Sequence, residues 1–347
     1  MIIYIGMIIM PFIIHFLCGK NKKIEVIIDS LLFIAFVGLR AESVGADTVR
    51  YIIAFEEITA MNFKVMIQNA IIHESPLYVV VSWIVSRISE SVPFYFCAVA
   101  LIHYWMLGRL MIKYSINVPF SYLIYTCLFL TLQLSGIKNT LATAFIFLAI
   151  DTAMEKKLGK FLLSAFVAIL FHRTSAVILI IYPLINHKNR LKAGKIAIGG
   201  IYATMLFILY ICRIQISNIF KTIGGYTDYG IHEAAPISMM VLCIAIVLLG
   251  LFSSDKEREF RVELLICSLA SLLMPLVFVN PSALRIVRYF LCMAVFLIPK
   301  SIRNLDQKFQ IRKLHNVVSI FFALLLGWQF LSTFSADSVY QYSFFWE

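Results

Sequence analysis

Long apolar segments, separated by short polar and basic ones, alternate along the whole chain. Most apolar segments run for ~17–25 residues, the length that crosses ~30 Å of hydrocarbon at ~1.5 Å per residue. The pattern therefore predicts an all-α, polytopic helical membrane protein that forms a single domain over residues 1–347. We expect about ten transmembrane helices, at residues 2–18, 24–39, 93–112, 118–135, 138–154, 195–214, 236–253, 262–279, 286–299 and 316–334.

Two further apolar segments do not fit a simple crossing. Residues 76–88 are too short to span and are followed at once by Arg87 and Glu90, so we interpret them as an interfacial or half-inserted helix. Residues 159–186 have basic residues before and after them, and His172 interrupts their apolar run. Since both ends then belong on the cytoplasmic side, this segment is predicted to form a re-entrant helical hairpin with His172 at its tip. Such a tip is tolerated where it lines a cavity.

Basic residues fix the orientation of the helices, because they collect on the cytoplasmic side of such proteins. Of the 30 Lys and Arg residues, this rule places twenty inside and ten outside. Both termini, the polar loop 40–75 and the loop 224–230 are then predicted to lie outside. The expected inner loops contain Lys20, Lys22, Lys23, Lys156, Lys157, Lys188, Arg190, Lys192, Lys256, Arg258, and Lys300 through Lys313.

Cations at the outer surface need an anionic partner, which points to a phosphorylated, lipid-borne ligand. The candidates for binding its phosphates are Arg40, Lys138, Arg285 and Arg288, with Asn139, Arg173 and Tyr289 beside them. The candidate catalytic residues, which could take a proton from a sugar hydroxyl, are His172, Glu74 and Asp47. Each Arg alone could instead be an interfacial anchor, and His172 could be a buried structural histidine. These alternatives stay open at this point.

Other features argue against several classes of function. The net charge of +11 is attributed to topology, so no nucleic-acid partner is expected. The seven cysteines form no CxxC pair, and we expect neither a metal site nor a cofactor. No P-loop, GxGxxG, HExxH or GxSxG motif occurs. Asp29, inside a predicted span, could serve packing or a proton relay, whereas His103 is expected to be a satisfied core histidine.

Five short motifs occur in an order and spacing that resemble the EpsG-like branch of the Wzy-type polysaccharide polymerases. They are Gly38-Leu39-Arg40 with Val44-Gly45-Ala46-Asp47-Thr48 and Tyr51, Glu74-Ser75-Pro76-Leu77-Tyr78, Gly136-Ile137-Lys138-Asn139-Thr140-Leu141-Ala142, His172 with Ser175-Ala176, and Arg285 with Tyr289-Phe290. The family usually has Arg-Gln where this chain has Lys138-Asn139, so the charge is kept but the bidentate fork is lost. Ala46 stands where Thr is common.

The resemblance implies a multi-pass enzyme of the bacterial inner membrane, similar to multi-span glycosyltransferases that use lipid-linked donors. Such an enzyme would polymerise undecaprenyl-diphosphate-linked oligosaccharide repeat units on the outer face of that membrane. The product would be a surface polysaccharide, that is, an O antigen, capsule or exopolysaccharide, and undecaprenyl diphosphate would leave. A flippase and a chain-length regulator of the same pathway are the implied partners, besides the lipid bilayer.

Three other functions would use a similar outer face. A flippase or transporter of lipid-linked sugars should show two related halves with corresponding broken helices, and the sequence shows one break, at His172. An O-antigen ligase normally has a larger outer loop than the stretch 40–92. A membrane O-acyltransferase could use His172, but no other residue supports it. A polymerase is therefore the favoured interpretation.

Overall fold

The structure, a computed structural model, describes residues 2–19, 21–186, 195–216, 218, 236–253, 257–309, 314–334 and 341–347. Nearly all of them are helical, which confirms the all-α fold class. The chain divides into two compact units, residues 1–183 with 333–347 and residues 184–332, and each is described by itself. The single domain stays a prediction. The expected loop 224–230 and the predicted inner residues Lys20, Lys188, Arg190, Lys192, Lys256, Arg312 and Lys313 lie outside the described residues.

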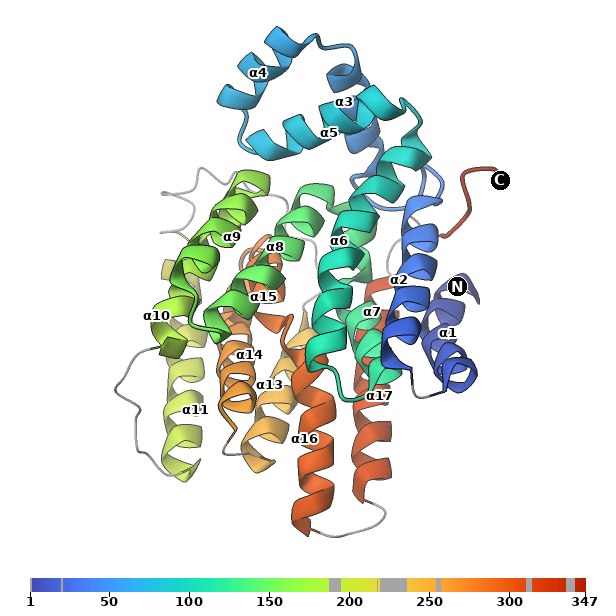
Figure 1. Ribbon diagram of the computed structural model, residues 1–347. Helices are drawn as coiled ribbons and strands as arrows, with labels where there is room; N and C mark the ends of the chain where they lie inside the picture. Colours follow the sequence, from blue (N-terminus) through green and yellow to red (C-terminus); the bar gives the residue numbers. More distant parts are fainter. Residues whose placement is uncertain are drawn as a thin grey trace. The chain divides into compact units, whose positions relative to one another are not determined.

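The first unit holds a row of helices in which α2 packs on α6, α6 on α8 and α8 on α9 (Figure 1). The α1 helix packs on α2 and α7. The elements of this unit are α1 (Ile2–Cys18), α2 (Lys22–Gly38), α3 (Thr48–Thr59), α4 (Phe63–Ile72), α5 (Pro76–Ile88), α6 (Val92–Tyr114), α7 (Val118–Ser135), α8 (Ile137–Met154), α9 (Leu158–Phe171) and the 3-10 helix η1 (Arg173–Ile180). The short α10 (Ile181–Asn186) runs across the boundary to the second unit.

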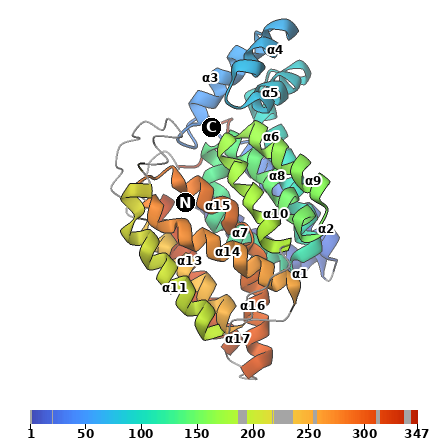
Figure 2. The same ribbon diagram turned by 90° about the vertical axis from the view of Figure 1, so that its left-hand side faces the viewer.

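Three short helices, α3, α4 and α5, lie together at one end of the first unit in both views (Figures 1 and 2). Residues 40–75, predicted to form an outer polar loop, are largely helical because they contain α3 and α4, and their side of the membrane stays a prediction. Ile52, Phe55 and Ile58 recur every three residues and are all buried, which is the mark of an amphipathic helix. The α5 helix runs crosswise to α6 in Figure 1, as an interfacial helix would. Its place in the bilayer stays a prediction.

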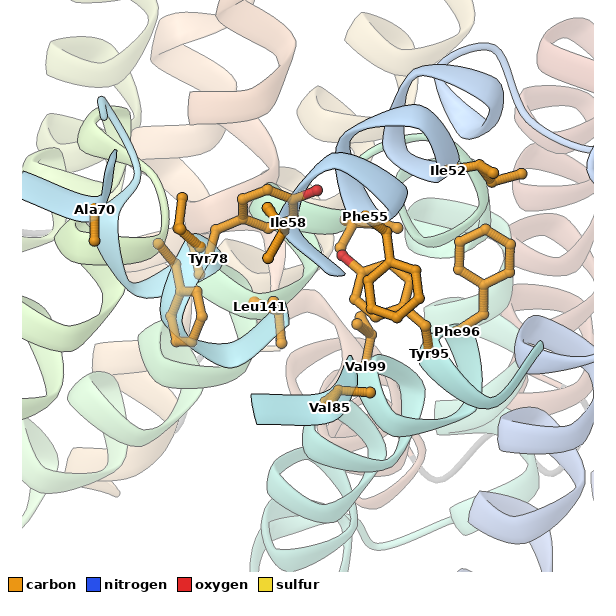
Figure 3. Close-up of a cluster of buried hydrophobic side chains, with 14 of the residues drawn as sticks. Ile52, Phe55, Ile58, Ala70, Tyr78, Val85, Tyr95, Phe96, Val99 and Leu141 are labelled. Atoms are coloured by element: carbon orange, nitrogen blue, oxygen red, sulfur yellow. The ribbon is translucent and has the colours of Figure 1, made fainter. Parts of the chain in front are cut away.

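A buried apolar cluster joins these three helices to the ends of α6, α8 and α9 (Figure 3). Phe55 of α3 stacks on Tyr95 of α6 with their ring centroids 4.2 Å apart. Tyr78 of α5 and Leu141 of α8 belong to the same cluster, and so does Phe96 of α6. Burial of so many large side chains holds α3, α4 and α5 against the ends of α6, α8 and α9.

The hairpin predicted for residues 159–186 is present. The α9 helix ends at Phe171, and His172 has extended backbone angles, φ −158° and ψ 114°. The chain then returns through η1 and α10, and the Tyr182 hydroxyl donates a hydrogen bond to the Lys156 carbonyl at 3.0 Å. Because residue 182 lies beside the residues that precede α9, the turn-back at His172 is confirmed. Its entry from the cytoplasmic side stays a prediction.

The second unit is built around α14, which packs against α11, α13, α15 and α16. Its helices are α11 (Lys195–Ile211), α13 (Ile237–Phe252), α14 (Arg258–Val277), α15 (Ala283–Leu291), α16 (Ala294–Phe309) and α17 (Leu314–Phe334). The prediction of one helix at 286–299 is wrong, because the chain breaks at Cys292 and Met293. Both residues are buried, and such a break is tolerated in an apolar segment that is surrounded by protein.

The α16 helix also extends through residues that were expected to form an inner loop. Lys300 lies within it, and its Nζ donates to Glu263 Oε1 of α14 at 2.6 Å. Both side chains are almost fully buried, at 7% and 0% exposure. The ion pair therefore connects two helices inside the second unit.

Several helices have the length and composition of membrane spans. Five meet both criteria among the described residues: Val92–Tyr114, Val118–Ser135, Ile137–Met154, Arg258–Val277 and Leu314–Ser332. The predicted spans 2–18, 195–214 and 236–253 coincide with shorter apolar helices, and 24–39 coincides with α2, whereas 286–299 is broken. The chain is a polytopic helical membrane protein, and the total of ten spans stays a prediction.

Candidate functional site

Arg40 is placed by the close approach of α2 and α6. Gly38 is the last residue of α2, and a Cβ added there would lie 2.8 Å from the Cys97 Cα on α6. Only glycine permits two helix backbones to come so near. The motif Gly38-Leu39-Arg40 thus has a physical basis, because the glycine brings Arg40 against the first turns of α6.

The next motif, residues 44–48, fastens the following loop to the end of α7. Gly45 has a φ of +104°, and a Cβ there would lie 2.7 Å from the Leu134 carbonyl carbon. The Thr48 hydroxyl hydrogen-bonds the Leu134 carbonyl at 3.0 Å, and the Ala46 amide donates to Ser135 Oγ at 3.0 Å. These bonds satisfy groups at the C-terminus of α7 that have no partner within the helix.

The Arg40 side chain is buried in protein, with 2% of its surface exposed. The guanidinium lies over the ring of Phe96, 4.0 Å from its centroid, and Nη1 donates to the Val37 carbonyl. Nε and Nη2 have no hydrogen-bond partner among the described residues, and no carboxylate there forms an ion pair with Arg40. Burial lowers the pKa of this guanidinium from 12.5 to about 10, so it remains protonated at pH 7.

A small internal cavity adjoins Arg40, with a volume of about 10 Å³. This is the size of one water molecule. A hydrogen-bonded polar network lines it. Tyr104 donates to Gln133 Oε1 at 2.6 Å. The Nδ1 atom of His103 is hydrogen-bonded to the Thr140 carbonyl at 2.9 Å, and its Nε2 atom is hydrogen-bonded to the Tyr125 hydroxyl. His103 is satisfied at both ring nitrogens, as expected. The sequence interpretation did not connect it with Arg40, although a buried polar residue within a span was available as a signal.

The segment 341–347 forms another side of the Arg40 region. Arg40 and Phe344 form an isolated antiparallel bridge. The Ala41 amide donates to the Ser343 carbonyl at 2.9 Å, and the Phe345 amide donates to the Leu39 carbonyl at 3.0 Å. Sequence reasoning missed this segment entirely, since nothing in its local pattern indicates its pairing partner.

A second group of polar residues meets where α5, α8 and α9 come together. Glu74 and Arg173 form an ion pair at 3.1 Å, and the Lys138 ammonium lies 4.8 Å from the ring centroid of Tyr78. Burial lowers the pKa of the adjacent His73, and the nearby Lys138 lowers it further. Three of the predicted site residues are therefore neighbours in space. Glu74 and Arg173 are both well exposed, so their attraction is weak.

The first turns of α8 take part in both regions. Thr140 and Ile137 line the small cavity beside Arg40, whereas Lys138 lies at Tyr78. This division follows from helix geometry, in which positions three apart share a face. Asn139, predicted to assist, is buried in the same turns.

The other predicted residues are more scattered. His172 is half-buried and adjoins Arg173, so it lies at the edge of the second group. Asp47 begins α3, and its carboxylate lies 3.7 Å from Arg50 of the same helix. The candidates on α15 belong to the second unit, where Arg285 is partly exposed and Arg288 and Tyr289 are buried. The functional roles of all the predicted site residues stay predictions.

Cations at the far ends of α6 and α8 are bound differently from Arg40. Lys113 donates to Asp151 at 2.5 Å and to Glu155 at 2.6 Å. Lys157 lies 2.7 Å from Glu155, and the two ammonium groups lower the pKa of this carboxyl to about 2. These basic residues have acidic partners within the protein, whereas Arg40 has none in the described chain.

A sequence model of one protein family matches residues 23–344, which is nearly the whole chain. The chain belongs to the EpsG family. The match covers every motif on which the resemblance rested, and EpsG-family membership supports a membrane role in polysaccharide biosynthesis. No match is found among the curated proteins or the solved structures.

Within this EpsG-family chain, no group of three or more His, Cys, Asp or Glu residues in the described ranges is arranged to hold a metal ion. Asp29 of α2 is buried, and neither carboxylate oxygen has a hydrogen-bond partner in the described part of the chain.

Proposed function

We propose that this protein polymerises lipid-linked oligosaccharide repeat units into an exported polysaccharide, and that Arg40 binds the diphosphate of the lipid carrier. Membership of the EpsG family supports the polymerase role. The observation that carries the assignment of Arg40 is its burial without an acidic partner in the described chain.

The energetics favour a ligand for this group. Removing a guanidinium from water costs roughly several kcal/mol of free energy, unless an opposite charge and hydrogen bonds compensate this cost. The Phe96 ring offsets about 2 kcal/mol of that cost through its negative face. Nε and Nη2 are two donors on one planar group, the arrangement that recognises phosphate oxygens in pairs. A diphosphate supplies both the charge and the acceptors.

The proposed reaction is glycosyl transfer. A hydroxyl of the acceptor saccharide attacks the anomeric carbon of the donor, the bond from that carbon to the diphosphate oxygen breaks, and undecaprenyl diphosphate leaves. Arg40, aided by Lys138, stabilises the negative charge that develops on the leaving group. Glu74, which pairs with Arg173, or His172, the residue before Arg173, accepts the hydroxyl proton as general base. Arg285 and Arg288, which belong to the second unit, are proposed to bind phosphate on the ground of their positive charge alone.

The test compares Arg40→Ala and Arg40→Lys with Arg50→Ala, a nearby arginine whose side chain is 78% exposed. Cells carrying each variant are scored for long polymer, single-repeat surface glycan and protein level. Loss of a charge-assisted contact in a dry site costs about 2–4 kcal/mol, so Arg40→Ala should reduce polymer formation about a hundredfold or more. Arg40→Lys should recover only part, while Arg50→Ala should behave as wild type. Full-length polymer in Arg40→Ala would remove Arg40 from the mechanism.

A flippase of lipid-linked oligosaccharides is the second candidate. The second unit contains a broken helix at Cys292, in addition to the turn at His172 in the first unit, and transporters commonly pair such breaks. The sequence argument against transport rested on a single break and is weakened by this finding. The same assay separates the two functions, because loss of a flippase removes single-repeat surface glycan together with the polymer.

A further inference from the structure

A groove of about 340 Å³ opens beside Arg40. Its volume lies within the range of small-molecule sites, roughly 300–1,000 Å³. Residues 40–43 form one wall, Val92 and Pro93 at the start of α6 form the second, and the segment 341–347 forms the third. All three walls belong to the first unit.

The segment 341–347 is held firmly in this position. Besides its main-chain bonds to the end of α2, the Tyr342 hydroxyl donates to the Phe36 carbonyl at 2.5 Å. Phe344 stacks on Trp346 with centroids 4.5 Å apart. One carboxylate oxygen of Glu347 accepts the Phe344 amide at 3.0 Å, which closes a turn and fixes the direction of the carboxylate. The third wall is thus a preorganised surface.

The groove is lined by charges of both signs. Arg40 brings a positive charge to the lining, with its Nε and Nη2 atoms buried, whereas Glu42 and Glu347 bring negative charge and Ser43 brings a hydroxyl. We call Glu42 and Glu347 the rim carboxylates. Phe345 lines the third wall and is half exposed. A diphosphate in the groove is attracted by the charge of Arg40 but repelled by the rim carboxylates. The groove therefore suits a ligand that is anionic at one end and neutral, with many hydroxyl groups, at the other.

Sugar rings have these properties at the neutral end. Their hydroxyl groups donate short, strong hydrogen bonds to carboxylates. Their C–H faces carry partial positive charge and pack on the negative faces of aromatic rings. We propose that this groove binds the first sugar of the lipid-linked saccharide, the one attached to the diphosphate, and that it selects a neutral sugar over a uronic acid. The inference rests on the proposed function, in which Arg40 binds that diphosphate.

Selection against acidic sugars follows from the two rim carboxylates. A uronic acid in the groove would bring a third carboxylate close to Glu42 and Glu347, and the like charges would repel. A neutral sugar avoids this repulsion and gains hydrogen bonds to charged acceptors. Each such bond changes affinity by about tenfold or more.

The test measures binding to the full chain in lipid nanodiscs with three probes. They are farnesyl diphosphate, farnesyl-diphosphate-linked N-acetylglucosamine and farnesyl-diphosphate-linked glucuronic acid. The wild type should bind the N-acetylglucosamine probe about tenfold more tightly than either of the others. The double variant Glu42→Gln with Glu347→Gln should lose most of this preference. Glutamine still accepts the Phe344 amide, so the turn is kept.

The matched control is Glu56→Gln with Glu57→Gln, which removes two exposed carboxylates from α3 at the same end of the unit. It should keep the wild-type sugar preference. An unchanged preference in the rim variant, with farnesyl diphosphate binding lost in Arg40→Ala, overturns the sugar groove and leaves the diphosphate site standing. If Arg40→Ala binds farnesyl diphosphate as tightly as the wild type, the diphosphate site is refuted. If the rim variant also loses the sugar preference, the sugar groove is supported in the same experiment.

Discussion

Replacing Gly38 by alanine should damage both stability and activity, because the new methyl group meets the backbone of α6. The added Cβ would lie 2.8 Å from Cys97 Cα and 3.0 Å from Cys97 N. Carbon atoms rest at about 3.5–4.0 Å, so α2 must retreat by roughly 0.8 Å. Overpacking of this kind costs about 1–3 kcal/mol, of which better helix propensity returns about 0.5–1 kcal/mol at most. We expect a net loss of about 1–2 kcal/mol.

The effect on activity should be larger than the effect on stability. Arg40 follows Gly38 by two residues, and a misplacement of about 1 Å in a catalytic group can lower a rate about a hundredfold. The assays are thermal unfolding of the purified protein in detergent and polymer formation in cells. Cys97→Ala combined with Gly38→Ala should recover only part of the loss, because the Cα and N of residue 97 remain.

The matched control is Gly6→Ala in α1 of the same unit, where nothing lies within 4 Å of the added methyl group. It should be neutral or slightly stabilising. If Gly38→Ala matched Gly6→Ala in both assays, the close packing of α2 on α6 would not be what positions Arg40.

Three further results are expected. Lys300→Met should destabilise the protein by about 3–5 kcal/mol, because it leaves the Glu263 carboxylate buried without its cation. In thermal unfolding, adding Glu263→Leu should restore much of this loss, and equal stability of the single and double variants would contradict the prediction. Glu74→Gln should change the unfolding free energy by less than about 1 kcal/mol, since its ion pair is exposed. Loss of polymer at a normal protein level would therefore support Glu74 as the general base, whereas normal polymer would exclude that role. Cysteines introduced at Lys160 and Lys188 should be labelled from the same, cytoplasmic side, and labelling from opposite sides rules out the re-entrant hairpin.

Much of the helical layout was predictable because hydrophobic length is a strong local signal. The predicted segments 2–18 and 118–135 match α1 and α7 at both ends. The hairpin followed from basic residues on both sides of one apolar run, an argument that needs no tertiary information. The helix at Thr48–Thr59 was missed, although its buried residues follow helical spacing, because its acidic residues outweighed that pattern.

Features that depend on distant parts of the chain could not be predicted. Residues 286–299 are apolar except for Arg288 and Tyr289, so their hydropathy does not reveal the break at Cys292, which depends on surrounding helices. Arg40 was identified as a candidate, but its burial and its lack of an acidic partner in the described chain arise from packing against Phe96. The polar network at His103 joins three helices, and a single sequence does not indicate which of them are neighbours.

The pairing of residues 341–347 with the end of α2 has a consequence for biosynthesis. Tyr342 contacts Phe36, which the ribosome adds 306 residues earlier. While the intervening helices are being inserted, Arg40 therefore lacks the wall that Phe344 and Phe345 later provide. The groove beside it is completed only after residues 341–347 have been made, so a chain that stops before them inserts its helices without a finished site.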